Sequence, residues 1–339
     1  MLHIQQRFSV SMVLEKKFAI YKERVNQYIE TILPPASNSE PKNLYEPIRY
    51  AMEGSGKRLR PILLLITSEA LNGRFEAVLP AAAAVELMHN YTLVHDDIMD
   101  HDTMRRGRPT VHHKWDTDIA LLSGDGLLTL AYRSLLRTQS PHLQRAAQVF
   151  TDGLIELCEG QCHDHDFEHD DRVTMPQYLH MIRQKTARFF SICTEMGALL
   201  AGAPEAKASL VRQFGESLGL AFQIQDDLFD ITVSQAVLGK DFGSDVKRRK
   251  RTFLYVYTMA HGNPAQRDGL QQIFRKAEIT DHDVLLAQKI FGDAGALAAA
   301  ETALREHLQK AHECLQRLEP AVDTTELHGF VEMILKRKF

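Results

Sequence analysis

The 339-residue chain is 44% hydrophobic and 25% charged, and its formal net charge is −4. This composition is typical of soluble globular proteins, and the lack of a strong basic bias argues against nucleic acid as a partner. Four cysteines are too few for a disulfide framework, so we expect a reducing, cytoplasmic setting. Apolar runs such as 61–66 fall far short of the roughly 20 residues of a membrane span, so we expect no stable membrane insertion.

The chain reads as one predicted helix after another. Helical patterns predict helices over residues 21–33, 43–52, 61–71, 77–101, 123–136, 142–167, 175–201, 207–230 and 253–261. Three further helices are expected at the C-terminus. Strand signals are scarce, and no fixed repeat or low-complexity linker divides the chain. We therefore predict an all-α fold in a single domain over 1–339. Residues 1–15 are expected to be a disordered or misassigned extension, because the charged helical pattern begins just after Met12.

Two aspartate-rich clusters share one spacing, Asp96-Asp97-x-x-Asp100 and Asp226-Asp227-x-x-Asp230. Residues four apart lie on one face of a helix, so the first and last carboxylates of each cluster are neighbours. Such like charges repel, and a cation is expected to offset that cost. Hard carboxylate oxygens suit Mg²⁺, which completes its coordination with water and substrate phosphates. We therefore predict metal binding at both clusters, with a solvated acidic face as the alternative.

Basic residues accompany both clusters. The turn 56–61 holds three cations, the segment 105–109 follows the first cluster, and Lys240 and the run 247–251 follow the second. Lysine and arginine at such positions bind phosphate oxygens, arginine with a bidentate fork. The alternatives are solvated surface turns, arginines that neutralise the first cluster without a ligand, and a targeting or nucleic-acid patch at 247–251.

A second group of metal-binding residue types lies between residues 158 and 171. Its members are Cys158, Cys162, His163, His165 and His169, interspersed with Asp164, Asp166, Asp170 and Asp171. These residue types could form a zinc or other transition-metal site. The alternative is a helix that lines a cavity and is followed by an exposed polar loop.

The order of these motifs resembles the trans-prenyltransferases, also called polyprenyl diphosphate synthases. The resemblance spans about 44–259 and rests on six motifs in order: Gly-Lys-Arg-x-Arg-Pro at 56–61, Leu-Val-His-Asp-Asp-Ile-Met-Asp at 93–100, Arg-Arg-Gly-x-Pro-Thr at 105–110, Lys-Thr at 185–186, Phe-Gln-Ile-Gln-Asp-Asp-x-x-Asp at 222–230 and Gly-Lys at 239–240. It implies an isoprenoid synthase fold, a bundle of helices around a deep central cavity, and a homodimer. The helical Gly-Gln-x-x-Asp of the family is matched at 160–164.

The resemblance also assigns roles. Asp96 and Asp100 would ligate two Mg²⁺ ions and Asp226 a third, with Asp97, Asp227 and Asp230 in supporting or water-mediated positions. The allylic diphosphate would be held by Arg105, Lys185, Thr186, Gln223 and Lys240, of which Arg105, Lys185 and Lys240 are the candidate catalytic residues. The isopentenyl diphosphate would be held by Lys57, Arg60, His89 and Arg106. Lys250 is a further candidate, although the basic run makes its register ambiguous.

The implied reaction joins isopentenyl diphosphate head to tail to an allylic diphosphate. The allylic C–O bond breaks, three Mg²⁺ ions and the cations stabilise the departing diphosphate, and the alkene attacks the resulting carbocation before a proton is lost. Residues four, five, eight and eleven positions before Asp96 would line the path of the growing chain: Thr92, Tyr91, Met88 and Val85. In the family, an aromatic residue five positions before the cluster marks short-chain products, so the resemblance implies geranylgeranyl diphosphate first and farnesyl diphosphate next. The alternative is that Tyr91 is simple core packing.

Three other functions remain open at this point. An all-α terpene cyclase shares the metal-assisted ionisation but does not need Lys57, Arg60 and His89 for a second diphosphate. A non-catalytic subunit of a heteromeric synthase typically loses aspartates, whereas both clusters are whole here. An acidic metal-buffering helical protein would leave the ordered cations unexplained.

Overall fold

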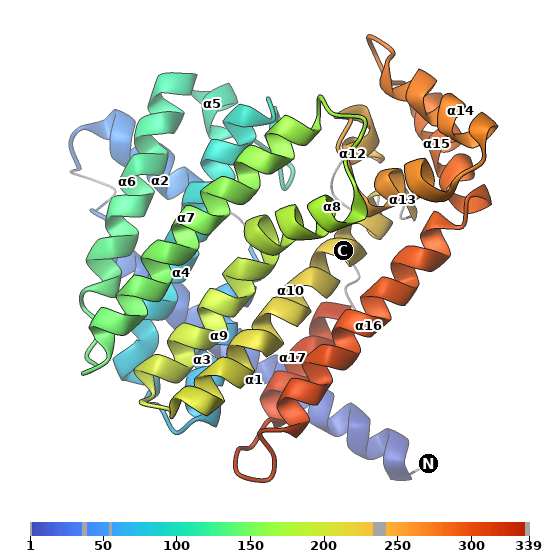
Figure 1. The fold of residues 1–339 in the computed structure, drawn as a ribbon. Helices are drawn as coiled ribbons and strands as arrows, with labels where there is room; N and C mark the ends of the chain where they lie inside the picture. Colours follow the sequence, from blue (N-terminus) through green and yellow to red (C-terminus); the bar gives the residue numbers. More distant parts are fainter. Residues whose placement is uncertain (1, 36–38, 54–55, 233–241, 336–339) are drawn as a thin grey trace. The chain divides into compact units, whose positions relative to one another are not determined.

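The computed structural model describes residues 2–35, 39–53, 56–232 and 242–335 (Figure 1). These residues form two compact units. Unit 1 is drawn from residues 1–149, 193–211 and 318–332, and unit 2 from 150–192, 212–317 and 333–339. Each unit is described by itself below. The single domain expected over 1–339 stays a prediction.

Unit 1 holds the N-terminal helices, coloured blue to green in Figure 1. They are α1 (Leu2–Ile32), α2 (Lys42–Met52), α3 (Leu59–Ala70), α4 (Phe75–Met99), α5 (Val111–Lys114) and α6 (Thr117–Leu135). Helix α4 packs extensively against α6 and α3. Its run Ala81–Ala84 is fully buried, and such small side chains permit close approach of neighbouring helices. Residues 61–68 of α3 are buried on every face, so α3 lies inside this unit.

A short hairpin follows α4. Strands β1 (Met104–Arg105) and β2 (Arg108–Pro109) pair antiparallel, with Arg105 opposite Arg108. The two turn residues, Arg106 and Gly107, have φ angles of 52° and 74°. Positive φ at both central positions is the geometry that closes a two-residue hairpin. Two residues per strand give no alternating pattern, which explains why the sequence did not predict this hairpin.

Unit 2 contains most of the remaining helices. They are α7 (Leu143–Phe167), α8 (Met175–Ile182), a π-helical turn (Arg183–Ala187), α9 (Arg188–Leu200), α10 (Glu205–Thr232), α12 (Ser244–Lys247), α13 (Phe253–His261), α14 (Pro264–Phe274), α15 (Asp281–Asp293), α16 (Ala296–Gln316) and α17 (Thr325–Leu335). Helices α7, α9, α10 and α17 contribute residues to both units. In Figure 1, α13, α14 and α15 lie together, and their apolar side chains share one core with α8 and α10.

The all-α prediction is confirmed, with differences in detail. The helix expected over 175–201 is interrupted by the π-helical turn at Arg183–Ala187. The structure has four described helices after α13 where three were expected, because only Ala294 and Gly295, the latter with a φ of 77°, separate α15 from α16 in an alanine-rich run. The helix expected from Tyr21 begins at Leu2, so residues 2–15 have helical backbone. The helix expected from Ser123 begins at Thr117. Asp116 caps it by accepting a hydrogen bond from Ile119 N at 2.7 Å. Among the described helices, none has the length and apolar character needed to cross a membrane.

Candidate active site

The first aspartate cluster closes helix α4. Asp100 N donates to Asp96 O at 2.8 Å, so the helical register continues to the last aspartate of the cluster. Asp96 and Asp100 are half-buried and lie on the same side of the helix end, whereas Asp97 is buried. The three aspartates therefore have unequal environments.

Asp97 is bound by the hairpin that follows. Arg105 Nε donates to Asp97 Oδ1 at 2.5 Å, and Arg105 Nη2 lies 3.7 Å from Asp102 Oδ2. Burial raises the pKa of Asp97 to about 6, although the Arg105 guanidinium acts in the opposite direction. Asp97 thus anchors Arg105 beside the cluster.

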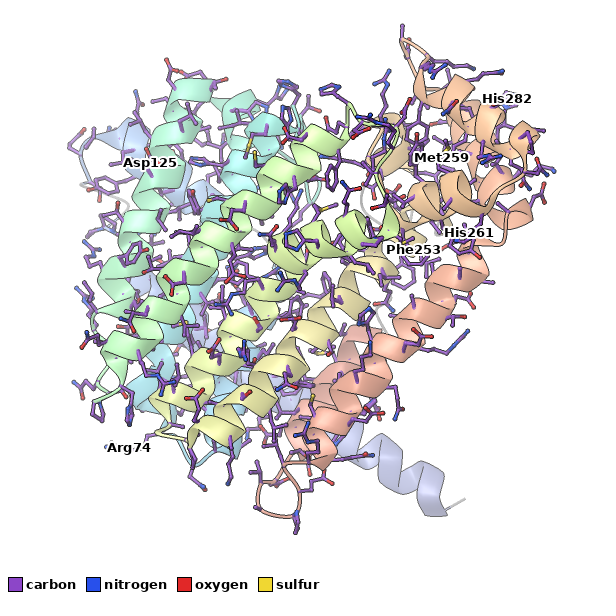
Figure 2. The ribbon with its side chains drawn as sticks, in the orientation of Figure 1. Arg74, Asp125, Phe253, Met259, His261 and His282 are labelled. Carbon is purple, nitrogen blue, oxygen red and sulfur yellow. The ribbon has the colours of Figure 1, made fainter. Side chains whose placement is uncertain are left out.

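The second cluster lies near the end of α10. Asp227 is buried and accepts three hydrogen bonds, from Tyr178 Oη at 2.7 Å, from Phe253 N at 2.9 Å and from Gln223 Nε2 at 3.0 Å. Burial raises the pKa of Asp227 to about 6, and these donors work against that effect. Phe253 is the first residue of α13 (Figure 2). Asp227 therefore ties α10 to α8 and α13.

The last aspartate of this cluster is also held by the protein. Asp230 accepts from Ser244 Oγ at 2.8 Å and from Asp245 N at 3.1 Å. Asp226 is half-buried on the same helix. In both clusters the middle aspartate is thus occupied by protein donors, and these contacts favour a supporting role for Asp97, Asp227 and Asp230. The assignment of all six aspartates to a metal site stays a prediction.

Lys185 and Thr186 belong to the π-helical turn. Thr186 Oγ1 donates to Gln223 Oε1 at 2.8 Å, which joins it to Asp227 through the Gln223 amide. Two glycines face this turn. A Cβ on Gly160 of α7 would lie 2.4 Å from Lys185 N, and one on Gly219 of α10 would lie 2.5 Å from the Cα of Ala187. Single π-helical turns occur frequently at functional sites.

Lys185 and Lys250 share one carboxylate, that of Asp164, and the sequence did not predict this pairing. Lys185 Nζ donates to Asp164 Oδ2 at 2.7 Å, and Lys250 Nζ donates to the same oxygen at 2.8 Å and pairs with Glu168 at 2.6 Å. Burial would raise the pKa of Asp164, but the two lysines lower it to about 2. The Gly-Gln-x-x-Asp pattern at 160–164 was the available signal for this residue.

The basic run after the second cluster mostly contacts its own unit. Lys247 pairs with Asp281 at 2.7 Å, Arg249 donates to the carbonyl of Phe274 at 3.0 Å, and Arg251 pairs with Asp171 at 2.8 Å. Lys247, Arg249 and Arg251 thus make structural contacts within the protein. Lys250 differs from them, because its ammonium reaches Asp164. Lys240 lies outside the described residues.

The residues expected to hold isopentenyl diphosphate meet in unit 1. Arg60 Nη1 and His89 Nε2 are 3.1 Å apart, and burial together with the Arg60 charge holds the pKa of His89 well below its usual value. Lys57 is exposed at the start of the same turn. A Cβ on Gly56 would lie 2.9 Å from Arg106 Nη1, so the hairpin arginine also reaches this turn. Arg60 and Arg106 thus bring two cations close to His89, and Lys57 precedes Arg60 by three residues, while the assignment of the four to isopentenyl diphosphate stays a prediction.

The Cys/His/Asp group at 158–171 does not gather as a metal site. Cys158 and Cys162 are exposed, and His163 Nδ1 lies 3.0 Å from Gln184 Oε1. Asp164 and Asp171 pair with the basic residues described above. Over the described part of the chain, no three His, Cys, Asp or Glu side chains are placed to hold a metal ion by themselves. The contacts favour the cavity-lining helix and polar loop over the zinc site.

The candidate chain-length residues lie on α4 upstream of the first cluster. Met88 and Val85 are fully buried, and Tyr91 and Thr92 are half-buried. The Tyr91 ring packs edge to face on His95 at a centroid distance of 4.8 Å, and Thr92 Oγ1 donates to His89 O at 2.8 Å. The assignment of Tyr91 as the floor of the product path stays a prediction.

Comparison with known proteins decides the family. Residues 41–291 match the polyprenyl synthetase family model. The chain belongs to the polyprenyl synthetase family. It is 34% identical to a geranylgeranyl diphosphate synthase of Methanosarcina mazei over 97% of this chain and 99% of the relative. Among solved structures, the chain resembles a geranylgeranyl pyrophosphate synthetase from Pyrococcus horikoshii, with 31% sequence identity and a TM-score of 0.88. The match covers 98% of this chain and 99% of that one.

A third relative adds a ligand-bound structure. It is a polyprenyl synthase from Caulobacter crescentus complexed with calcium and isoprenyl diphosphate, 28% identical with a TM-score of 0.88 over 97% of this chain and 98% of that one. These neighbours confirm the predicted isoprenoid synthase fold, and the family match confirms that the protein is a prenyltransferase.

Proposed function

We propose that this prenyltransferase joins isopentenyl diphosphate head to tail to an allylic diphosphate and releases geranylgeranyl diphosphate as its main product. The observation that carries the proposal is the gathering of Arg60 and Arg106 near His89 in unit 1, with Lys57 three residues before Arg60. An enzyme that only ionises one allylic diphosphate needs the aspartate clusters but has no use for this second group. A chain-elongating enzyme needs both.

The donor set of the two clusters fits Mg²⁺. Asp96, Asp100 and Asp226 are the carboxylates that would hold it, while Asp97, Asp227 and Asp230 are bound by protein donors. Among the described residues, no three His, Cys, Asp or Glu side chains are placed to hold a metal ion together. Mg²⁺ typically takes one or two carboxylates and completes its coordination with water and phosphate oxygens. When bound, Mg²⁺ supplies positive charge that stabilises the departing diphosphate. Three ions remain a proposal.

The protein's own groups account for the rest of the chemistry. Lys185, Thr186 and Gln223 are proposed to bind the allylic diphosphate, held in place by Asp164 and Asp227. The charge on such preorganised donors favours the state in which negative charge has moved to the diphosphate. His89 stays neutral, so it can accept from Arg60 at Nε2 and donate from Nδ1 to the isopentenyl diphosphate. The released diphosphate is the proposed proton acceptor.

Product length is proposed from the wall of α4. Tyr91, five residues before Asp96, is the large side chain on the proposed path of the growing chain, and it is braced by His95. The high-coverage relatives named as geranylgeranyl synthases support a C20 product over C15. A homodimer and a cytoplasmic location stay predictions, and size-exclusion chromatography with light scattering tests the first.

The decisive experiment is elongation in vitro. The purified protein is incubated with isopentenyl diphosphate, Mg²⁺ and, in turn, C5, C10 and C15 allylic diphosphates, and products are sized after dephosphorylation. We expect each starter to be extended to C20, with little longer material. Failure to extend any starter would refute the proposal. Cyclic hydrocarbons would favour the terpene cyclase, and accumulation of C15 without further extension would favour a farnesyl diphosphate synthase.

A further inference from the structure

The basic turn carries three cations, Lys57, Arg58 and Arg60, and the middle one is more buried than the other two. Arg58 is only 7% exposed, whereas Lys57 beside it is exposed. Arg58 also has left-handed backbone, with a φ of 53°. A residue other than glycine adopts this conformation at a cost and keeps it only where the surroundings enforce it. The contacts of the Arg58 side chain identify those surroundings.

The Arg58 guanidinium binds three partners from three different helices. Nη1 donates to Glu86 Oε1 of α4 at 2.7 Å, Nε donates to Asn26 Oδ1 of α1 at 2.9 Å, and Nη2 donates to the carbonyl of Met52, the last residue of α2, at 2.8 Å. Each of the three guanidinium nitrogens thus has an acceptor within the protein. The planar fork of arginine suits this arrangement, and a lysine ammonium would not reproduce it.

Glu86 is the buried end of this ion pair. It is 2% exposed, and Asn90 Nδ2 donates to its Oε1 at 3.1 Å. If Arg58 turned to bind a substrate, it would leave a buried carboxylate without its cation, which is strongly unfavourable. Burial lowers the pKa of Arg60, and the Glu86 carboxylate works against that effect, so Glu86 also offsets the charge of Arg60.

The ion pair stands next to the proposed isopentenyl diphosphate site. Glu86 precedes His89 by three residues on α4, and Arg58, at the N-cap of α3, precedes Arg60 in the first turn of that helix by two. The turn is therefore joined to α4 twice, by the Arg58–Glu86 pair and by the Arg60–His89 contact at 3.1 Å. A Cβ on Gly56 would lie 3.2 Å from Arg58 Nη1, so the turn backbone passes close to the guanidinium.

We infer that Arg58 is a positioning residue for isopentenyl diphosphate, which through Glu86 and Asn26 holds Lys57 and Arg60 in their binding geometry without touching the substrate. This inference rests on the proposed role of Lys57 and Arg60. It separates the three cations of the turn into two substrate ligands and one anchor. The anchor links α1, α2 and α4 to the turn, so that the proposed ligands are fixed before substrate arrives.

The test compares Michaelis constants for the two substrates. Arg58→Lys keeps the charge but loses the fork, and it should raise the KM for isopentenyl diphosphate about 10- to 100-fold, the loss of one or two charge-assisted hydrogen bonds. The KM for the allylic diphosphate should change less than about twofold. The matched control is Arg49→Lys on α2. Arg49 also bonds a backbone carbonyl, that of Pro34, and pairs with Glu30, so its replacement should leave both constants unchanged.

A second variant separates anchoring from direct contact. Glu86→Gln keeps the shape of the side chain and removes its charge. An anchored turn predicts that the KM for isopentenyl diphosphate rises, and that Arg58→Lys combined with Glu86→Gln is little worse than either alone. If Arg58 instead binds the substrate directly, Glu86→Gln should leave the KM for isopentenyl diphosphate unchanged or lower it, because Arg58 is released from its buried partner. That result would overturn the inference.

Two further variants keep the outcome interpretable. Asn26→Ala removes one of the three acceptors, leaves the ion pair intact and should give a smaller rise in the same constant, even if Arg58→Lys folds poorly. Lys57→Ala tests the site itself. If Lys57→Ala leaves the KM for isopentenyl diphosphate unchanged, the proposed site is wrong. If Lys57→Ala raises it while Arg58→Lys and Asn26→Ala do not, only the anchor is wrong.

Discussion

Replacing Tyr178 by Phe removes one hydroxyl from the buried Asp227 carboxylate. The ring of Tyr178 is 1% exposed, and its Oη donates to Asp227 Oδ2 at 2.7 Å. Asp227 keeps its bonds from Gln223 and Phe253. A hydrogen bond to a charged group contributes about 1.5–3 kcal/mol, so the Tyr178→Phe variant should lose about that much stability. At roughly 2 °C per kcal/mol, its Tm should fall by about 3–6 °C.

The chain offers a matched control for this substitution. Tyr255 has a ring that is also 1% exposed, but its Oη donates at 3.2 Å to Asp171, whose side chain is 39% exposed and already paired with Arg251. Tyr255→Phe should therefore cost less than about 1 kcal/mol. The measurement is thermal unfolding at pH 8, where Asp227, with a pKa raised to about 6, is ionised.

Enzyme activity supplies a second measurement on the same pair of variants. Asp227 adjoins Asp226 on α10, and partners that orient a ligand-bearing segment typically change metal affinity 10- to 100-fold when removed. Tyr178→Phe should thus need about tenfold more Mg²⁺ for half-maximal turnover, and Tyr255→Phe should not. Equal and small Tm changes for the two variants, with equal Mg²⁺ requirements, would refute the role assigned to Tyr178.

Three further outcomes are expected. Tyr91→Ala should lengthen the product beyond C20, as judged by chain-length analysis, and an unchanged product spectrum would remove Tyr91 from the product path. Gly160→Ala should cost about 1–3 kcal/mol and reduce turnover, because its Cβ would lie 2.4 Å from Lys185 N, whereas Gly292→Ala, with its nearest neighbour at 3.8 Å, should change neither. Chelation of divalent metal should abolish turnover and leave the Tm of the substrate-free protein unchanged, because no three-ligand group exists among the described residues. A large loss of Tm on chelation would indicate a structural metal.

Much of the helical fold could be predicted because local patterns dominate it. Helix α13 was predicted with its observed bounds, and α2 and α7 to within one residue at each end. Boundaries were missed where the local signal is weak. The start of α6 lies six residues before the expected Ser123, and the break at Gly295 is hidden in an alanine-rich run. The four-residue helices α5 and α12 are too short to show a periodic pattern.

The aspartate clusters were visible in the sequence, and the resemblance already gave Asp97 a supporting position. The partner of Asp97 was not visible, because only the fold brings Arg105 to Asp97 and leaves Asp96 half-buried. The same holds for the basic turn, where Arg58 differs from Lys57 because Glu86, 28 residues later, lies within 2.7 Å. Tertiary partners of this kind carry no local signal.

The π-helical turn at Arg183–Ala187 constrains how this protein can be altered over evolutionary time. A π turn amounts to one residue inserted into an α-helix, and its wider backbone fits here because α7 and α10 present glycines at positions 160 and 219. Deleting one residue would restore a continuous α-helix, so Lys185 and Thr186 would lose the wide turn from which they reach Asp164 and Gln223. Replacing either glycine first would collide with the turn. The insertion and both glycines must therefore be inherited as a set, and a chimaera that exchanges α7 or α10 with another helix must carry the matching glycine to keep the turn.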